Sequence, residues 1–476
     1  TYSVQVTAQP DRQNCAFTGD QYGTVNSNVT LQVTCVPGYL RSGAMTSNKP
    51  IALNYHLYRG NATLLAGGGS GAVCPGSNTA NCFDGVGTAA RFSSPHGMTI
   101  VNGVIYIADR ENNRIRKYDI ATNTTSTFAG EGSPATTDGT GTSARINKPQ
   151  GITSDGVNLF VTESPSAPDI SYIRRINIAT QQVTTIAGGA SVAGGVSCPG
   201  TVQATCRDGS AFQALFGLPN DIDYHSGHLY ISEYGNNRVR RMNLATGQVE
   251  TIAGNGTAAS VDDTTGTSAS FNGAAGLTLL GNSIYVVDYN GHRVRTISLT
   301  APHAVGSLVG TGVAGHADGP YATARFANPD HIFADARDLY VTEYGANRLR
   351  RINLAKNTVS TIAGSGGATD AGGVGPAAAF GGPVGIVSDG ARLFVATYNG
   401  GRLFRVSDAG LVGSWQIEPG VSPNDYSSDN TSVLNGSVSG GSLSTLTDRF
   451  GNANGASLFN GAGHQIMAAT TGLPSG

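Results

Sequence analysis

The sequence predicts an all-β protein whose main part is a six-bladed β-propeller. A segment of about 55 residues recurs down the chain, and its most constant part is an aromatic–aliphatic run ending in an acid and followed by Arg-x-Arg. Glycine accounts for 67 of 476 residues, and Gly-, Thr- and Asn-rich turns separate short Val/Ile/Tyr runs without any stretch of helical period. A repeat of this length with several short strands is typical of a radial β-array. The copies start at residues spaced 54, 70, 55, 55 and 54 positions apart, namely Tyr106, Phe160, Tyr230, Tyr285, Tyr340 and Phe394.

Composition excludes two classes of partner. Only 13% of the residues are charged and the net charge is -2, so no strong positive field would attract nucleic acid or an anionic membrane. No apolar stretch reaches the length of about 18 residues that a membrane-spanning helix needs. We therefore expect no nucleic acid and no membrane span.

Residues 1–60 differ from the repeats and predict a small β module. Alternating residues at Tyr2–Thr7 and Val29–Thr34 are typical of half-buried strands, and Cys15 and Cys35 would join the pair. This stretch resembles repeat modules of large bacterial surface proteins, which carry YSVTV…QPxGQxC…VxVTC.

The other cysteines lie in two equivalent loops. CPGSNTANC (Cys74–Cys82) and CPGTVQATC (Cys198–Cys206) have the same spacing, and each ends two residues before Asp-Gly. A metal site would need four converging ligands, which these loops do not supply. We predict the disulfides Cys74–Cys82, Cys198–Cys206 and Cys15–Cys35, and from them an extracellular or cell-surface location.

Each repeat is expected to contain four strands, which in the third copy are Asp221–Tyr224, Leu229–Glu233, Arg238–Leu244 and Val249–Ala253. The motifs IAG, DGxGTxARF, PxG, YVxD and NxRxR recur, as in the run from Phe83 to Phe92 followed by Pro95-His96-Gly97. They resemble NHL-repeat β-propellers over roughly residues 62–410. This resemblance implies one six-bladed NHL-type propeller.

Most of the recurring residues have a structural explanation. The aromatic residue that starts each copy is expected to fill the layer between two blades. Acids and arginines of the repeat would form charge-assisted pairs that lock blade to blade. These are the acids Asp109, Glu163, Glu233, Asp288 and Glu343, the arginines Arg114, Arg174, Arg238, Arg293 and Arg348, and the loop acids Asp84, Asp138, Asp208, Asp318 and Asp370.

The expected domains are a β module at 1–60, the propeller at 61–415, and a linker with the start of another domain at 416–476. Either Leu64–Gly67 or Leu411–Trp415 would close the sixth blade. The run Leu446–Ala456 resembles the first strands of concanavalin/laminin-G-like sandwiches, yet only 61 residues follow Trp415 and a sandwich needs about 100. We expect the chain to be a piece of a larger multidomain surface protein.

The residue after the proline of each blade should line the mouth of the channel. These residues are His96, Gln150, Asn220, Asp330 and Val384, with Ala275 in the fourth blade, which lacks the proline. NHL-like amidating lyases hold zinc through histidines from several blades, but here only His96 is in register, with His331 one position later. We expect no metal, no cofactor and no catalytic residue.

One departure from the family pattern points to recognition. Four successive blades place a tyrosine after the acid, where such repeats usually have a small polar residue, namely Tyr234, Tyr289, Tyr344 and Tyr398. An arc of such rings suits sugar stacking or contact with a protein. The alternative is a structural role in which each ring covers its neighbouring arginine.

The function predicted from these observations is a non-enzymatic extracellular scaffold or adhesion segment. The binding residues would be the four tyrosines with His96, Gln150, Asn220 and Asp330, and the partner a protein, a glycan or another copy of the chain. The alternative is a carbohydrate-active or lyase-type enzyme that uses the channel. RNA binding, known for some NHL proteins, is disfavoured because the arginines have structural roles.

Overall fold

The fold is taken from a computed structural model of the chain. It describes residues 60–408 except 78–79, 166–169, 190–193, 195, 201–205 and 336–337, together with backbone strands at 2–3, 13–18, 22–23, 32–37, 436–439, 444–446, 456–458 and 465–468. The chain divides into two compact units, one formed by Arg59–Ser407 and the other by Thr1–Tyr58 with Asp408–Gly476.

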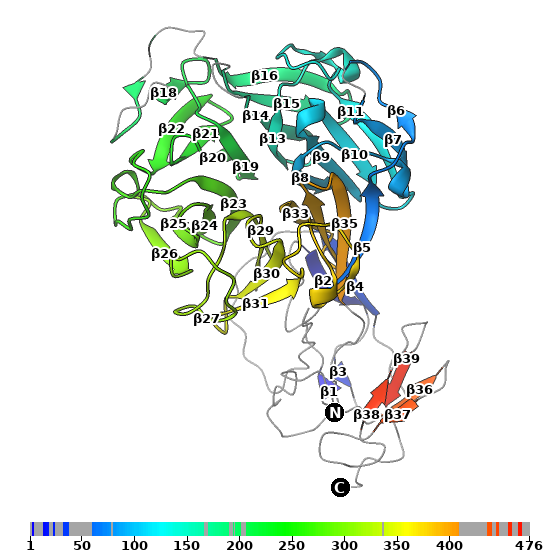
Figure 1. Cartoon of the computed structure of the whole chain (residues 1–476). Coiled ribbons are helices and arrows are strands. Elements are labelled where there is room, and N and C mark those ends of the chain that lie inside the picture. The colour runs from blue at the N-terminus through cyan, green and yellow to red at the C-terminus, as the bar shows by residue number, and fades with distance from the viewer. Residues whose placement is uncertain are drawn as a thin grey trace. The chain divides into compact units, whose positions relative to one another are not determined.

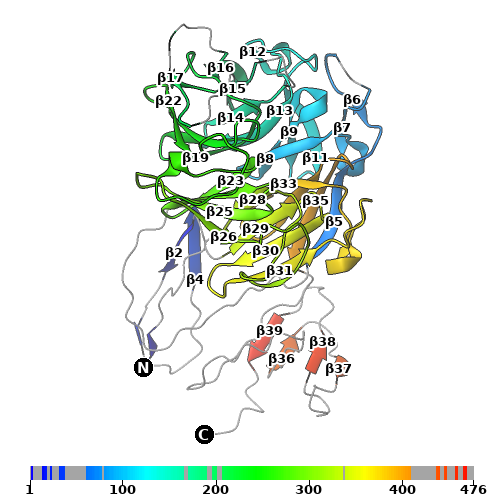
Figure 2. The same cartoon turned by 60° about the vertical axis from the view of Figure 1, so that its left-hand side comes forward.

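The first of these units is a six-bladed β-propeller (Figure 1). Each blade is an antiparallel sheet in which four strands follow one another from the centre outwards, as β28 to β31 do in Figure 2. The innermost strands are β8 (Pro95–Val101), β13 (Pro149–Ser154), β19 (Pro219–His225), β23 (Ala274–Leu280), β28 (Pro329–Ala334) and β33 (Pro383–Ser388). The second strands are β9 (Val104–Asp109), β14 (Asn158–Glu163), β20 (His228–Glu233), β24 (Ser283–Asp288), β29 (Asp338–Glu343) and β34 (Leu393–Thr397).

The outer half of each blade is built in the same way. The third strands are β10 (Arg114–Asp119), β15 (Tyr172–Asn177), β21 (Arg238–Asn243), β25 (Arg293–Ser298), β30 (Arg348–Asn353) and β35 (Arg402–Asp408). The fourth strands are β11 (Thr124–Ala129), β16 (Gln182–Gly188), β22 (Gln248–Ala253), β26 (Val305–Val309), β31 (Thr358–Ala363) and β5 (Gly60–Gly67). Short accessory strands extend five of the blades, namely β6 (Ala72–Val73), β7 (Phe83–Val86), β12 (Gly139–Thr140), β17 (Val196–Ser197), β18 (Arg207–Ser210), β27 (Gly319–Pro320) and β32 (Gly373–Val374).

Helical structure within the described residues is confined to single 3₁₀ turns. They are η1 (Gly87–Ala89), η2 (Arg110–Asn112), η3 (Gly141–Ser143), η4 (Gly266–Ser268) and η5 (Gly375–Ala377). Within that same part of the chain, no helix has the length and apolar character needed to cross a bilayer.

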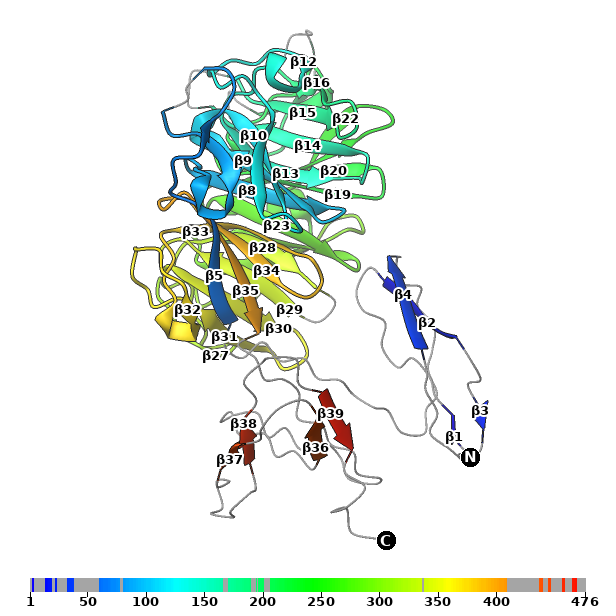
Figure 3. The same cartoon turned by 90° about the vertical axis from the view of Figure 1, so that its right-hand side faces the viewer.

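The two ends of the propeller segment meet in the sixth blade. β5 lies between β35 and β32 in that sheet, and the blue β5 runs beside the orange β35 in Figures 1 and 3. The register pairs Ala62 with Gly373 and Asn61 with Val374. The structure therefore decides in favour of the closing segment that contains Leu64–Gly67, while Leu411–Trp415 lies outside the described residues.

The core consists of apolar layers between adjacent blades. One layer joins Tyr106 and Ile115 of the first blade to Ile152 and Leu159 of the second. Phe394 of the last blade packs in the same way with Ile107 of the first. Since alternate residues of a strand point to opposite faces, each second strand supplies both of its neighbouring layers. The prediction that the repeat aromatics fill these layers is confirmed for Tyr106, Phe160, Tyr230, Tyr285 and Phe394.

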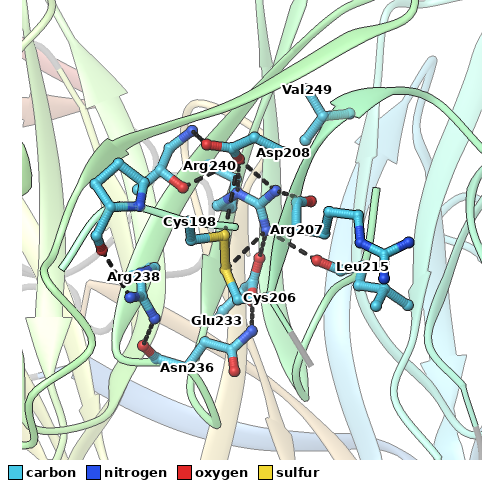
Figure 4. Close-up of polar contacts among 12 residues, drawn as sticks. Cys198, Cys206, Arg207, Asp208, Leu215, Glu233, Asn236, Arg238, Arg240 and Val249 are labelled. Carbon is cyan, nitrogen blue, oxygen red and sulfur yellow. Dashed lines mark hydrogen bonds and ion pairs between the residues drawn. A yellow bond between two sulfur atoms is a disulfide. The ribbon is translucent and has the colours of Figure 1, made fainter. Parts of the chain in front are cut away.

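The charged residues of the repeat lock strands within a blade, so the prediction that they join one blade to the next was wrong. Figure 4 shows the arrangement in the third blade, where fully buried Arg240 contacts Glu233 at 2.5 Å and Asp208 at 2.6 Å. Arg240 and Glu233 stand on neighbouring strands, and Asp208 lies on the accessory strand β18 of the same sheet. One guanidinium thus connects the second, third and accessory strands.

The arginine that pairs with the acid also differs from the prediction, except in the second blade, where Arg174 pairs with Glu163 as expected. The partner is the second arginine of Arg-x-Arg, because the first one is occupied by loop carbonyls. Arg238, for example, donates to the backbone oxygens of Pro199, Asn236 and Asn255. The corrected partners of the acids are Arg116, Arg240, Arg295 and Arg350, and Asp262 is the loop acid of the fourth blade, which sequence analysis missed.

The sixth blade replaces this buried ion pair with uncharged residues. Thr397 stands where the other blades have the acid, and Phe404 stands where they have the second arginine. Phe404 packs edge-on against Phe380 with ring centroids 5.4 Å apart. Arg240 lies over the equivalent Phe216, with its guanidinium carbon 5.3 Å from the ring centroid. An aromatic pair therefore takes the place of a cation–π contact and an ion pair.

The structure contains both of the predicted short disulfide loops. Cys74 is bonded to Cys82 and Cys198 to Cys206, each across eight positions of sequence. Both loops are also held by the first arginine of their own blade, since Arg114 donates to the oxygen of Pro75 and Arg238 to that of Pro199.

In the other unit, four short strand pairs are described at the level of the backbone. β2 (Gln13–Thr18) pairs with β4 (Gln32–Pro37), and the register places Cys15 opposite Cys35. β1 (Tyr2–Ser3) pairs with β3 (Tyr22–Gly23). The first predicted strand therefore has a different partner from the one expected. The remaining pairs are β36 (Gly436–Ser439) with β39 (Gln465–Ala468) and β37 (Ser444–Leu446) with β38 (Ala456–Leu458).

Candidate functional site

The inner strands form a closed ring at the centre of the propeller. Each contacts the inner strands of both neighbouring blades, and β33 contacts β8 to complete the circle. Glycine at the third position of the strand permits this approach in four blades, since a Cβ on Gly385 would lie 2.0 Å from the backbone oxygen of His96. The residues predicted to line the channel occupy the second position of these strands.

The other two blades carry titratable residues at that third position. Asp221 follows Asn220 in β19, and His331 follows Asp330 in β28. Both side chains are buried. Asp221 was not among the predicted site residues, although the replacement of Pro-x-Gly by Pro-Asn-Asp in the third copy was a visible signal. We call His96, Gln150, Asn220, Asp221, Asp330 and His331 the axial cluster.

Hydrogen bonds join the cluster across blades and fix the orientation of its amides. Arg110 Nε donates to Gln150 Oε1 at 2.7 Å, and because a guanidinium only donates, the amide nitrogen of Gln150 must face the other way. That nitrogen lies 2.9 Å from Asn220 Oδ1 and 2.9 Å from His96 Nε2. His96 Nε2 therefore accepts, and its proton resides on Nδ1.

The second part of the cluster centres on His331. His331 Nδ1 donates to Asp330 Oδ1 at 2.7 Å, while its Nε2 lies 3.8 Å from Asp221 Oδ1. The His96 and His331 rings meet edge to face with centroids 4.7 Å apart. Of the predicted channel residues, the structure thus brings together His96, Gln150, Asn220 and Asp330, while Ala275 and Val384 are buried apolar members of the same ring.

Burial and neighbouring charges shift the pKa values of the two histidines in opposite directions. Burial lowers the pKa of His96 to about 3, so this imidazole is neutral at physiological pH. Burial alone would also lower the pKa of His331, but Asp221 and the hydrogen bond to Asp330 outweigh it and raise that pKa. Burial raises the pKa of Asp221 to about 6, and the contact with His331 lowers the pKa of Asp330 despite burial.

Three side-chain nitrogens of the cluster are buried without a hydrogen-bond partner. They are His96 Nδ1, Asn220 Nδ2 and His331 Nε2. A buried donor that lacks an acceptor costs about 1–3 kcal/mol. Such a concentration of unmatched donors is unusual in a folded protein and is typical of a functional position.

His96, Asp330 and His331 are also the residues that best fit a metal ion. One ligand atom from each lies within 4.8 Å of the others, and all three residues are buried. The sequence predicted no such site because His331 is one position out of register, yet the fold brings its ring beside His96. Two contacts oppose metal binding, because Gln150 already occupies the acceptor nitrogen of His96 and His331 is hydrogen-bonded to Asp330.

The four tyrosines form a continuous arc. Ring centroids are 5.8 Å apart between Tyr234 and Tyr289, 6.5 Å between Tyr289 and Tyr344, and 6.1 Å between Tyr344 and Tyr398. Each side chain is half-buried, so one environment repeats in four blades. Arg110 and Ser164 occupy the equivalent position in the first two blades. We call the four tyrosines the tyrosine arc.

The tyrosine arc adjoins the axial cluster. The ring of Tyr398 stands perpendicular to that of His96, with centroids 6.1 Å apart. Burial raises the pKa of Tyr289, and nearby Asp330 raises it further. Polar neighbours hold the arc in place, since Asn290 Nδ2 donates to Tyr234 Oη at 3.2 Å and Arg110 Nη1 to Tyr398 Oη at 3.5 Å. A partly exposed aromatic surface therefore borders a buried polar one.

Comparison with known proteins agrees with this architecture. The model of the NHL repeat matches residues 92–118. NHL repeat-containing protein 2 of Bos taurus is 25% identical over 312 residues, which are 59% of this chain and 41% of the bovine protein. The human protein of that name is 47% identical over 49 residues, which are 10% of this chain and 7% of the human protein. The chain thus spans less than half of the length of these relatives.

Solved structures from Bacteroides thetaiotaomicron share the fold. A protein of unknown function superimposes with a TM-score of 0.52 at 19% identity, covering 73% of this chain and 76% of that one. An auxiliary nutrient binding protein gives a TM-score of 0.51 at 16% identity, with the same coverage of 73% and 76%. Residues 59–407 thus form a six-bladed β-propeller that is similar to NHL repeat-containing proteins and that carries a match to the NHL repeat at residues 92–118.

Proposed function

We propose that this propeller is a non-enzymatic binding module of an extracellular multidomain protein. It acts as a scaffold or adhesion segment whose tyrosine arc engages a protein, a glycan or another copy of the chain. The observation that carries the proposal is the arc itself, in which four half-exposed rings touch in series beside a buried polar cluster. Tyrosine offers a large apolar face with little loss of conformational freedom on binding, which suits recognition.

Other observations support the location and the type of role. Two disulfides in surface loops favour an oxidising compartment. The second arginines of the first five repeats are fully buried in ion pairs, so they contribute little to a surface that could attract nucleic acid. The auxiliary nutrient binding protein of similar fold bears a name that states a binding role, which is the kind of role proposed here.

The proposal is tested with the full chain and a variant in which all four arc tyrosines are alanine. Glycan-array binding, capture of cell-surface proteins and sedimentation velocity cover the three types of partner. Each ring contributes about 0.5–1.5 kcal/mol beyond its buried area, so the variant should lose a micromolar interaction altogether. The matched fourfold Tyr→Phe variant keeps the rings and should retain most of the binding. Equal binding by the alanine variant in all three assays would contradict the proposal.

The axial cluster favours one second candidate, an enzyme of the carbohydrate-active or lyase type that works at the centre of the propeller. Its residues include a neutral imidazole, His96, beside an ionised carboxyl, Asp330, and such pairs serve in acid–base and metal-assisted catalysis. Elemental analysis of the purified chain tests it directly. One equivalent of a transition metal that is lost in His96→Ala would favour the enzyme over the scaffold.

A further inference from the structure

The excess of donors in the axial cluster indicates the chemistry of a ligand. The three nitrogens without a hydrogen-bond partner belong to side chains in mutual contact, because Asn220 and His96 share the amide nitrogen of Gln150 and the His96 ring abuts His331. Asp221, the acid beside His331, accepts the backbone N–H groups of Ile222 and Leu277. His96 Nδ1 and Asn220 Nδ2 are donors, so a ligand that pairs with them brings an acceptor oxygen.

Charge favours a neutral acceptor over an anion. His331 lies between the carboxyls of Asp330 and Asp221, so one imidazole faces two acids and the cluster has no net positive charge in either protonation state of His331. Arg110, the nearest cation on the other side, is paired with Glu111. The charges around the donors are therefore already balanced or slightly negative, and a buried carboxylate or phosphate would lack a free cation. A carbonyl oxygen accepts strongly without carrying a charge.

Burial limits the shape of the group that can reach these donors. His96 and His331 are each 4% exposed and Asn220 is 9% exposed, whereas the neighbouring Tyr398 is half-exposed. Only the end of a ligand can enter the cluster while its body remains on the arc. The acetamido group of a sugar is such a terminal carbonyl. A carbonyl inside a peptide chain is flanked on both sides by backbone, which would have to be buried with it.

We propose that the tyrosine arc and the axial cluster form one binding site for an N-acetylated saccharide. The acetamido oxygen accepts hydrogen bonds from the axial donors, and the apolar face of the pyranose ring packs against Tyr398 and its neighbours. Gln150, held by Arg110, acts as a positioning residue that keeps the Nδ1 proton on His96 and the amide of Asn220 facing the ligand. The inference rests on the proposed function and narrows its partner to one class of glycan.

The test uses isothermal titration and ligand-observed NMR on the full chain. N,N′-diacetylchitobiose is the probe, and cellobiose is the matched saccharide with hydroxyl groups in place of the acetamido groups. A tetraalanine peptide with free termini, whose amide carbonyls are all internal, serves as the peptide arm. We expect binding of diacetylchitobiose and at least about tenfold weaker binding of cellobiose, the loss of about two neutral hydrogen bonds.

Two variants remove single donors with little change of shape. Asn220→Asp keeps the oxygen that accepts from Gln150 and replaces the donor amide. His96→Met removes the Nδ1 donor and keeps an unbranched side chain of similar volume. Each should weaken diacetylchitobiose binding about 3- to 10-fold, as expected for one neutral hydrogen bond. His225→Gln, at the far end of β19, is the control and should bind as the unmodified chain does. Thermal melting of each variant verifies that it is folded.

The outcomes separate this inference from the proposed function. Unchanged binding in both folded cluster variants, with binding lost in the fourfold tyrosine variant, would overturn the axial site and leave the arc as the recognition surface. Equal affinity for cellobiose, or binding of the tetraalanine peptide in place of the sugar, would overturn the choice of an N-acetylated saccharide. If no saccharide binds, the choice of an N-acetylated saccharide is also overturned. The protein-capture and self-association assays then decide whether the proposed function stands.

Discussion

Loss of one buried arginine should destabilise the propeller far more than loss of that arginine together with its acid. In the third blade, Arg240 and Glu233 are both fully buried and lie 2.5 Å apart. Arg240→Phe leaves the Glu233 carboxylate buried beside an aromatic ring. Breaking a buried ion pair in this way costs about 3–5 kcal/mol. Glu233 retains the N–H of Gly217 and the amide of Asn236, which places the expected loss at the lower end of that range.

The sixth blade supplies the compensating change. There Thr397 and Phe404 occupy the two positions, and Thr397 Oγ1 donates to the loop acid Asp370 at 2.9 Å. Installing the same pair as Glu233→Thr with Arg240→Phe removes the buried carboxylate of Glu233 together with its arginine. We expect the double variant to recover about 2–3 kcal/mol relative to Arg240→Phe alone, because residues in one network couple by this amount.

Equilibrium unfolding in urea, followed by circular dichroism, measures both effects at pH 7. Since burial raises the pKa of Glu233, protonation should relieve part of the cost in Arg240→Phe as the pH falls towards 5. Glu250→Gln, in the exposed pair with Arg241 on the same sheet, is the control and should change stability by less than about 1 kcal/mol. Equal destabilisation of the single and double variants would refute the reasoning.

Three further predictions concern the cluster and the disulfides. Burial raises the pKa of Asp221 from its ordinary value of 3.8 to about 6 in the folded chain, so the folded state is penalised above pH 6 and relieved as the pH falls towards 4. From pH 4 to pH 7 the parent chain should therefore lose about 2–3 kcal/mol of unfolding free energy relative to Asp221→Asn. A difference between the two chains that does not change with pH would contradict the raised pKa of Asp221. Replacing Cys198 and Cys206 by serine should cost about 2–3 kcal/mol by the chain-entropy estimate, measured by thermal unfolding, and a stability loss below about 0.5 kcal/mol would show that Arg238 alone fixes the loop. Peptide mapping without reduction should recover Cys15 linked to Cys35, since the register places them opposite each other, and free thiols there would exclude that bridge.

Much of the candidate site could be predicted from the sequence because aligned copies of a repeat show the positions at which one blade differs from the others. Four tyrosines at one repeat position predicted an arc, and the structure shows the rings in contact. His96, Gln150, Asn220 and Asp330 were identified from their place after the blade proline. Asp221 was not predicted because the prediction considered only the residue after the proline. The loss of glycine at the next position indicated Asp221 equally well.

The sequence by itself determined the number of blades, their strands and the two short disulfide loops, since each depends on local periodicity and on spacing within one repeat. The tertiary structure decided how side chains from different blades combine. In four of the blades the second arginine pairs with the acid, because loop carbonyls surround the first arginine. The tertiary structure also closed the ring with β5 and brought His331 beside His96, although the two residues are one position out of register. Contacts between blades depend on the closure of the whole ring, and no single repeat contains that information.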